Sequence, residues 1–307
     1  MTEGKVEDDG GEFCGSAWVL ALNISEYSII LALYKYKTPY IVYKMCTAPN
    51  TNLRGFNQAL QTLLKTPSHF LPHLTIPTFT HLPEQLGPHL VQNDTTQTAA
   101  AAEKTKRKVP NIRALVLDKD NTLCYPKTTI FPPAIIQKLS ELRTSPTSPF
   151  NTTTTSNSSS SSSNDNTTSS ILIVSNRAGS HPNYDHEIHA LEDQLTKHNL
   201  SIPIFRLPPD VEKKPFCGDA VVDWFRERGV IERADEIAVV GDRLGTDGIM
   251  ARMMGSWSVW CRDGVFEGEE YARSQRNVLE RMEMWVERYL RVGRGLTAPS
   301  PKGWDDA

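Results

Sequence analysis

The chain has 307 residues, of which 39% are hydrophobic and 22% are charged, as is typical of a globular protein with one or two domains. Its net charge of −3 is small, so no overall electrostatic field draws it to nucleic acid, and we expect no nucleic-acid partner. The 5 cysteines are scattered and form no CxxC pair, which argues against a disulfide framework or a structural zinc site and favours a reducing compartment.

Residues 1–52 have an acidic start and an aromatic-rich stretch, and we interpret them as a variable N-terminal extension. Acidic residues surround the single Lys5 near the start, the opposite of the Arg-rich, acid-poor composition of a mitochondrial presequence. Residues 17–34 are largely apolar, but Asn23, Ser25 and Glu26 interrupt them. An interfacial or buried helix is therefore favoured over a membrane span.

Residues 53–110 begin with a short helical pattern over 56–64 and continue into a Pro-rich run over 70–79. Residues 92–110 are a polar linker with a basic cluster at its end, made of Lys104, Lys106, Arg107 and Lys108. Two interpretations of this cluster stay open: an ordinary solvated linker, or a patch that meets anionic lipid.

Residues 111–295 alternate short apolar runs with helical patterns, which predicts a doubly wound α/β fold with a parallel sheet and right-handed crossovers. The expected strands are 112–117, 171–174, 202–205, 237–240 and 257–260. The expected helices are 134–143, 185–198, 217–228, 248–254 and 272–292, the last a C-terminal helix before a tail at 296–307. Residues 144–170 are mostly Ser, Thr and Asn, which predicts a disordered surface insert.

Two carboxylates, Asp118 and Asp120, stand where the first predicted strand ends. Ligands bind at the carboxyl ends of strands in open α/β sheets, so both carboxylates can serve one site there. The first can attack phosphorus as a nucleophile, and the second can protonate the leaving oxygen and later activate water. Taken alone, such a pair more often forms a turn or a helix cap.

The next strand ends supply complementary groups. Ser175 and backbone N–H groups follow the second strand and suit a transferring phosphoryl group, although a capping role is the simpler explanation for Ser175 alone. Lys213 and Lys214 precede Pro215, which we expect to open a helix and to place a lysine near phosphate. Asp242 and Asp247 follow the fourth strand and suit an octahedral Mg²⁺, although Asp247 alone is also a good N-cap.

Taken in order, these motifs resemble those of the haloacid-dehalogenase-like hydrolase superfamily over roughly residues 112–262. The resemblance implies a Rossmann-like fold, a Mg²⁺ cofactor and an aspartyl-phosphate on Asp118, which is both nucleophile and metal ligand. It makes Asp120 the acid/base, with its backbone carbonyl on the metal, and it favours phosphatase over dehalogenase activity. It makes Asp242 a metal ligand supported by Asp247, and it favours Lys214 over Lys213 as the catalytic lysine. The expected phosphate-binding residues are Thr122, Ser175, Asn176 and Arg177.

Connections after the first and third predicted strands are short, where members of this superfamily often carry cap domains. We therefore expect a capless site that accepts a phosphate presented on a protein, a nucleic acid or a membrane surface.

A narrower resemblance rests on residues 71–79, 115–123 and 241–247, which look like the mitochondrial phosphatidylglycerophosphate phosphatases of fungi and plants. It implies conversion of phosphatidylglycerophosphate to phosphatidylglycerol, on the route to cardiolipin, by a peripheral protein on the matrix side of the inner mitochondrial membrane. It also implies an anionic phospholipid partner for the helix at 56–64, with Leu60, Leu63 and Leu64 inserting. The same helical period equally fits packing on the protein's own sheet.

Two other functions stay open. One is a soluble capless phosphatase that acts on protein or polynucleotide phosphomonoesters. The other is a non-catalytic lipid-binding protein on the same fold, against which the presence of both Asp118 and Asp120 argues. The closely spaced His181, His186 and His189 are more simply explained as solvated helix residues than as a metal site.

Overall fold

The computed structural model describes residues 52–91, 108–151, 169–208, 210–266 and 276–304. The predicted N-terminal extension up to residue 51, the basic residues Lys104, Lys106 and Arg107, and most of the Ser/Thr-rich insert lie outside the described residues. The described residues from Arg54 onward belong to one compact unit.

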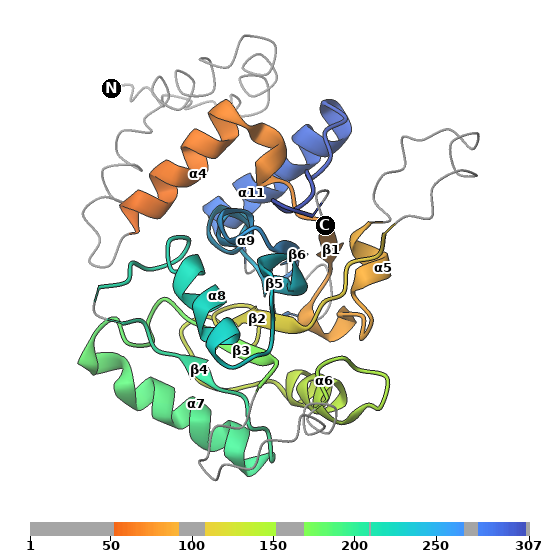
Figure 1. The fold of residues 1–307 in the computed structure, drawn as a ribbon. Helices are drawn as coiled ribbons and strands as arrows, with labels where there is room; N and C mark the ends of the chain where they lie inside the picture. The colour runs from red at the N-terminus through yellow and green to blue at the C-terminus, as the bar shows by residue number, and fades with distance from the viewer. Residues whose placement is uncertain (1–51, 92–107, 152–168, 209, 267–275, 305–307) are drawn as a thin grey trace, which may run out of the picture. The chain divides into compact units, whose positions relative to one another are not determined.

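Within the described residues, one sheet of six parallel strands forms the centre of the fold (Figure 1). In spatial order the strands are β1 (Leu74–Ile76), β6 (Trp257–Cys261), β5 (Ile237–Gly241), β2 (Ala114–Asp118), β3 (Ile171–Val174) and β4 (Ile204–Phe205). From β2 the chain first builds outward through β3 and β4, and then β5 returns to the other side of β2. The predicted doubly wound α/β fold is confirmed. Its topological switch point is at β2, where the connections diverge toward β3 on one side and β5 on the other.

Helices cover both faces of the sheet. Along β2, Leu115 and Leu117 face a cluster with α6 (Pro133–Thr144) and α7 (Asp185–Lys197). The alternate residues Ala114 and Val116 face a second cluster with α8 (Gly218–Glu227) and α9 (Ile249–Met254). This alternation is the period-2 side-chain pattern of a strand that is buried on both faces.

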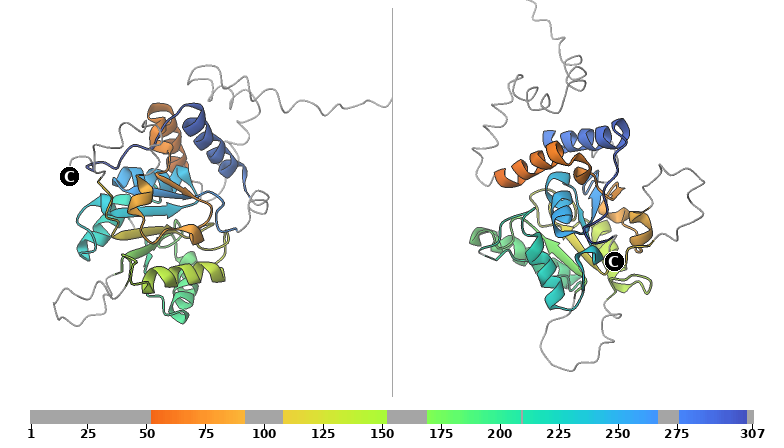
Figure 2. Two further views of the ribbon diagram at one scale, coloured as in Figure 1. Left: turned by 90° about the vertical axis from the view of Figure 1, so that its right-hand side faces the viewer. Right: turned by 45° about the horizontal axis from the view of Figure 1, so that its top comes forward.

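A third cluster lies beyond β6 and joins the two ends of the described chain. It contains Leu71, Leu244, Trp260 and Leu290, with Leu63 partly buried against it. Here α4 (Leu53–Lys65) lies beside α11 (Val278–Arg288), as both views of Figure 2 show. The short helix α5 (Gly87–Leu90) lies between β1 and the start of β2 in the chain.

The sequence did not predict strand β1. It is only three residues long, and it lies between Pro72 and Pro77 in the Pro-rich run. Proline lacks the N–H that a central strand needs, so such a run reads as irregular chain. In the structure β1 lies at the edge of the sheet and, among the described strands, pairs only with β6.

Two helix starts differ from the prediction. Residues Lys214–Cys217 form turns, and α8 begins at Gly218 rather than at Pro215 or Cys217. The turn is closed by the Phe216 N–H, which donates to the Lys213 carbonyl at 3.0 Å. At α11, the Asn277 side chain caps the helix by accepting hydrogen bonds from Leu279 N and Glu280 N, so the described helix begins at Val278.

Part of the segment expected to be a disordered insert is packed. Phe150 is fully buried in the cluster over α6, and Ser148 is 3% exposed and donates to the Leu142 carbonyl at 2.6 Å. Phe150, close to the end of α6, anchors these residues. The Ser/Thr-rich composition around it led to the prediction of disorder. No helix in the described part of the chain is long and apolar enough to cross a membrane.

The segment before β2 is an integral part of the core, and this leads to a stability prediction. Phe79 is fully buried in the cluster over α6. We expect Phe79→Ala to lower the free energy of unfolding by about 3–5 kcal/mol, because it leaves a cavity in a packed core. Val278→Ala is the control, because Val278 is 74% exposed, and it should change stability by less than about 0.5 kcal/mol. Urea unfolding measures both, and equal midpoints for the two variants would contradict this packing.

Candidate active site

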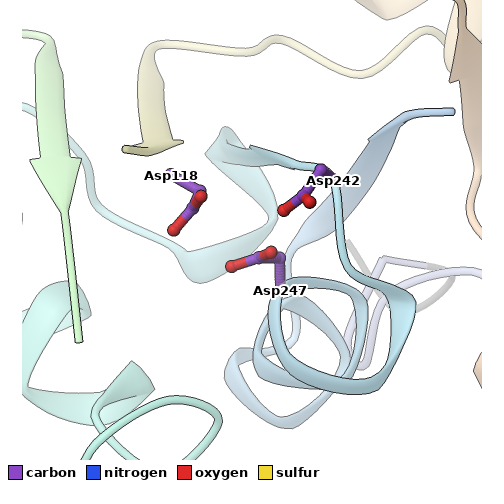
Figure 3. Close-up of side chains that lie close together, drawn as sticks. All are labelled: Asp118, Asp242 and Asp247. Carbon is purple, nitrogen blue, oxygen red and sulfur yellow. The ribbon is translucent and has the colours of Figure 1, made fainter. Parts of the chain in front are cut away.

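Three aspartates meet at the carboxyl edge of the sheet, at the switch point (Figure 3). Asp118 ends β2, Asp242 follows β5, and Asp247 lies in the π-helical turn Leu244–Gly248 that leads into α9. One carboxylate oxygen from each lies within 4.8 Å of the others. All three residues are buried, with at most 8% of their surface exposed.

Lys214 supplies the positive charge of this cluster. Its Nζ donates to Asp118 Oδ1 and also to Asp247 Oδ1, the latter at 2.7 Å, and the residue is 3% exposed. The Lys214 backbone N–H donates to Asn176 Oδ1 at 2.9 Å, which fixes the turn that carries the lysine. Of the two candidate lysines, Lys214 is therefore the one that the fold brings to the carboxylates.

Burial and like charge shape the electrostatics of the cluster. Burial, with the added repulsion of the Asp247 and Asp120 carboxylates, raises the pKa of Asp118 to about 7 against the opposing attraction of Lys214. Burial and the neighbouring Asp118 carboxylate also raise the pKa of Asp242 well above its usual value. Burial disfavours the charged form of Lys214, but the two carboxylates outweigh it and raise the lysine's pKa. One ammonium group thus faces three carboxylates, a surplus of negative charge that a bound cation would offset.

The residues present fit a hard divalent cation. Carboxylate oxygens are the ligands that Mg²⁺ prefers, and the three that converge here can share one ion. Asn121 donates from Nδ2 to Asp242 Oδ2 at 2.8 Å, which orients this carboxylate. The buried Oδ1 of Asn121 has no hydrogen-bond partner among the described residues.

Asp120 lies at the same edge in a different environment. Its side chain is 35% exposed, and its Oδ1 lies 3.2 Å from Lys119 Nζ. The same oxygen accepts a hydrogen bond from the Lys127 N–H at 3.1 Å. Arg177 Nε lies 4.0 Å from Asp120 Oδ2. Asp120 is therefore held by cationic and backbone donors at the margin of the site.

The remaining predicted phosphate-binding residues are placed as follows. Ser175 is 2% exposed and its Oγ accepts a hydrogen bond from the Arg177 N–H at 3.3 Å. The Arg177 guanidinium donates to both carboxylate oxygens of Glu187, each at 3.0 Å. Thr122 is fully buried, and its Oγ1 has no hydrogen-bond partner among the described residues. Asn176 acts through the Lys214 backbone.

The family described as mitochondrial PGP phosphatase matches residues 53–266, which include all six described strands and all of these polar groups. The chain belongs to this family.

Two curated relatives agree with the family assignment. The chain is 33% identical over 214 residues to "Phosphatidylglycerophosphatase GEP4, mitochondrial" of Saccharomyces cerevisiae, an alignment that covers 70% of this chain and 89% of the relative. It is 27% identical over 245 residues to "Probable phosphatidylglycerophosphatase, mitochondrial" of Schizosaccharomyces pombe, which covers 78% of this chain and 92% of the relative. No solved structure matches the chain significantly.

The sequence did not point to Glu283, which lies in α11 beyond the matched family segment. It is 4% exposed, and its carboxylate accepts hydrogen bonds from Leu244 N at 3.2 Å and Gly245 N at 3.1 Å. Arg243 Nε donates to it at 3.3 Å, and the Arg243 backbone N–H donates to Asp247 Oδ2, also at 3.3 Å. Glu283 therefore holds the turn that positions Asp247. On sequence it is one acidic residue among several in an amphipathic helix.

A metal-binding prediction follows from the surplus of negative charge. Without added metal, we expect Asp242→Asn to melt at or above the wild-type temperature, because the variant buries one carboxylate fewer. Added Mg²⁺ should raise the wild-type melting temperature by binding the folded state, and it should raise that of the variant much less. Thermal melts with and without Mg²⁺ measure this, with Asp193→Asn on the exposed side of α7 as the control. Equal Mg²⁺-induced shifts in wild type and Asp242→Asn would remove Asp242 from the metal site.

A second prediction concerns Glu283 as a positioning residue. Glu283→Ala removes the acceptors for the turn before Asp247, so the Mg²⁺ concentration at half-maximal thermal shift should rise, on the order of tenfold. Glu283→Gln keeps one acceptor and should restore part of this affinity. Glu227→Ala, at an exposed carboxylate of α8, is the control. If Glu283→Ala lowers stability but leaves the Mg²⁺ midpoint unchanged, Glu283 has only a structural role.

Proposed function

We propose that the protein is a Mg²⁺-dependent phosphatidylglycerophosphatase that works through an aspartyl-phosphate intermediate. It converts phosphatidylglycerophosphate to phosphatidylglycerol and phosphate, on the route to cardiolipin. The family membership and the names of the two relatives support this substrate. The observation that carries the chemistry is the contact of Lys214 with Asp118 and Asp247, directly beside Asp242.

In the first step, an Asp118 carboxylate oxygen attacks the phosphorus atom of the terminal phosphomonoester. The bond from phosphorus to the glycerol oxygen breaks, and Asp120 gives its proton to that oxygen as phosphatidylglycerol leaves. Asp120 is suited to this because it is partly exposed at the edge of the site, whereas Asp118 is recessed. In the second step, Asp120 takes a proton from water, whose oxygen attacks the phosphoryl group and frees Asp118 and phosphate.

Lys214 and the phosphate-binding residues stabilise charge during both steps. The Lys214 ammonium neutralises Asp118 and the incoming phosphate, and it needs little reorganisation because Asp247 already fixes it. Asp118, the Asp120 carbonyl, Asp242 and Asp247 would hold Mg²⁺, which supplies polarisation of the phosphoryl oxygens when bound. The proposed phosphate contacts are Thr122, Ser175, Asn176 and Arg177.

The site is proposed to be capless and to work at the matrix side of the inner mitochondrial membrane, on an anionic lipid surface. In α4, Leu63 is partly buried against the protein's own third cluster, so it anchors the helix. Leu60 and Leu64 are half-buried and are the residues proposed to enter the membrane. Arg54, in the first turn of α4, pairs with Glu212, so this end of the helix contacts the segment of chain that leads to Lys214.

Phosphate release from the purified protein with Mg²⁺ tests the proposal. We expect hydrolysis of phosphatidylglycerophosphate in preference to phosphopeptides and sugar phosphates. Asp118→Asn should abolish turnover while the fold is retained. Enzymes that hydrolyse phosphomonoesters accelerate the reaction by up to about 10²¹-fold, so removal of the nucleophile should cause a large fall in the rate of phosphate release. Asp193→Asn should retain full activity.

Other outcomes would select other functions. Preference for phosphopeptides or polynucleotide ends would support a soluble phosphatase on the same fold. Binding of anionic vesicles without any turnover would support a non-catalytic lipid-binding protein. Unchanged turnover in Asp118→Asn would refute the nucleophile and, with it, the mechanism.

A further inference from the structure

The loop Tyr125–Ile130, here called the rim loop, connects β2 to α6 and is joined directly to the site. The Lys127 backbone N–H donates to Asp120 Oδ1 at 3.1 Å. The Thr128 carbonyl accepts a hydrogen bond from Lys119 Nζ at 3.0 Å, and Lys119 is 1% exposed. The rim loop therefore forms the margin of the catalytic edge next to the proposed acid/base.

The rim loop is held in place on its other side by α7. The Gln194 side chain donates from Nε2 to the Thr129 carbonyl at 2.7 Å and accepts from the Phe131 N–H at 3.4 Å. Phe131 is 5% exposed and lies in the core. The backbone on both sides of Ile130 is thus fixed, and Ile130 is left 62% exposed.

The tip of the loop combines apolar and cationic side chains. Tyr125 is 42% exposed, with its ring centroid 5.5 Å from that of Phe266, and Lys127 is exposed. Single exposed apolar residues are common and need no explanation. Here two of them flank a lysine on one short loop that is hydrogen-bonded to Asp120. An amphipathic aromatic ring, an aliphatic side chain and a cation together suit the interface of an anionic bilayer.

The proposed substrate makes such a contact necessary, and the inference rests on that proposed function. The scissile phosphate of a bilayer lipid lies in the headgroup layer, whereas Asp118 is only 8% exposed. The margin of the site must therefore approach or enter the headgroup layer for the phosphate to reach Asp118. Helix α4 also approaches the turn that carries Asp247, because a Cβ added at Gly245 would lie 3.5 Å from the Ala59 Cβ.

We propose that the rim loop docks on the surface of an anionic phospholipid membrane, with Tyr125 and Ile130 entering the interface and Lys127 meeting the headgroups. Lys127 is hydrogen-bonded to Asp120, and Thr128 is hydrogen-bonded to Lys119. Docking of the loop therefore holds Asp120, the proposed acid/base, at the level of the headgroups. The loop thereby favours substrates that are presented in a bilayer over the same headgroup in solution.

The test compares the full-length wild type with Tyr125→Ser/Ile130→Ser. We expect the double variant to show a rise on the order of tenfold in apparent KM for phosphatidylglycerophosphate in phosphatidylcholine–phosphatidylglycerol vesicles, equivalent to about 1.4 kcal/mol. It should keep the wild-type kcat/KM for a short-chain, monomeric phosphatidylglycerophosphate. Co-sedimentation with the same vesicles should fall in parallel, and Lys127→Glu should weaken it more than it weakens binding to pure phosphatidylcholine.

Val109→Ser/Met253→Ser is the matched control. Val109 is 51% exposed just before β2, and Met253 is 48% exposed near the end of α9, so both lie toward the sheet edge opposite the site. This control should behave as wild type with vesicles and with the short-chain substrate.

Each contrary result has its own meaning. The docking proposal would be overturned if Tyr125→Ser/Ile130→Ser bound vesicles as wild type does and had the wild-type apparent KM for vesicle substrate. It would also be overturned if the variant lost as much kcat/KM with the short-chain substrate as with vesicles. Absence of phosphate release by the wild type from either form would overturn the proposed function instead. In that case co-sedimentation of the same variants would still decide whether the rim loop binds the membrane.

Discussion

The contact between the Lys214 ammonium and the carboxylates of Asp118 and Asp247 is the interaction on which the site depends. A buried carboxylate without a partner costs several kcal/mol, and this cluster buries three carboxylates around one lysine. The lysine offsets part of the electrostatic cost of burying these carboxylates, but one positive charge does not balance all three of them. The remaining negative charge makes the same cluster a candidate site for a divalent cation, so the stability of the cluster and the cation binding expected of it have one electrostatic origin.

The topology explains how distant residues reach this contact. Since β2 lies between β3 and β5, the connections at the carboxyl edge diverge at β2 and leave room for polar groups. Lys214 reaches this part of the sheet edge from the turn before α8, and Asp247 reaches it from the turn before α9. The close approach of Asp247 to β5 requires glycine at position 241, because a Cβ there would lie 2.4 Å from the Asp247 carboxylate. The motif Gly241-Asp242 is thus set by packing as well as by chemistry.

The sequence predicted what depends on regular periods and on order along the chain. Five of the strands and the residues at their ends follow from buried apolar runs, and Asp118, Lys214, Asp242 and Asp247 lie together as those positions require. It failed where a local signal was overridden or absent. The prolines beside β1 argue against a strand there, and the Ser/Thr-rich composition around Phe150 argues against a packed segment. Glu283 has the sequence context of any acidic residue in an amphipathic helix. These three features arise from tertiary contacts, which a single sequence does not contain.

Asp118 and Asp120 lie in different environments despite their closeness in sequence. Asp118, the proposed nucleophile, ends a fully buried strand, contacts Lys214 and is 8% exposed, which limits the access of water to its carboxylate. Asp120, the proposed acid/base, lies past the strand end, is 35% exposed and borders the rim loop, so solvent can reach its carboxylate. The bend of the chain after β2 therefore separates the buried Asp118 from the more exposed Asp120. The roles proposed for the two residues rest on this difference, because environment also divides the roles of two carboxylates in other hydrolases.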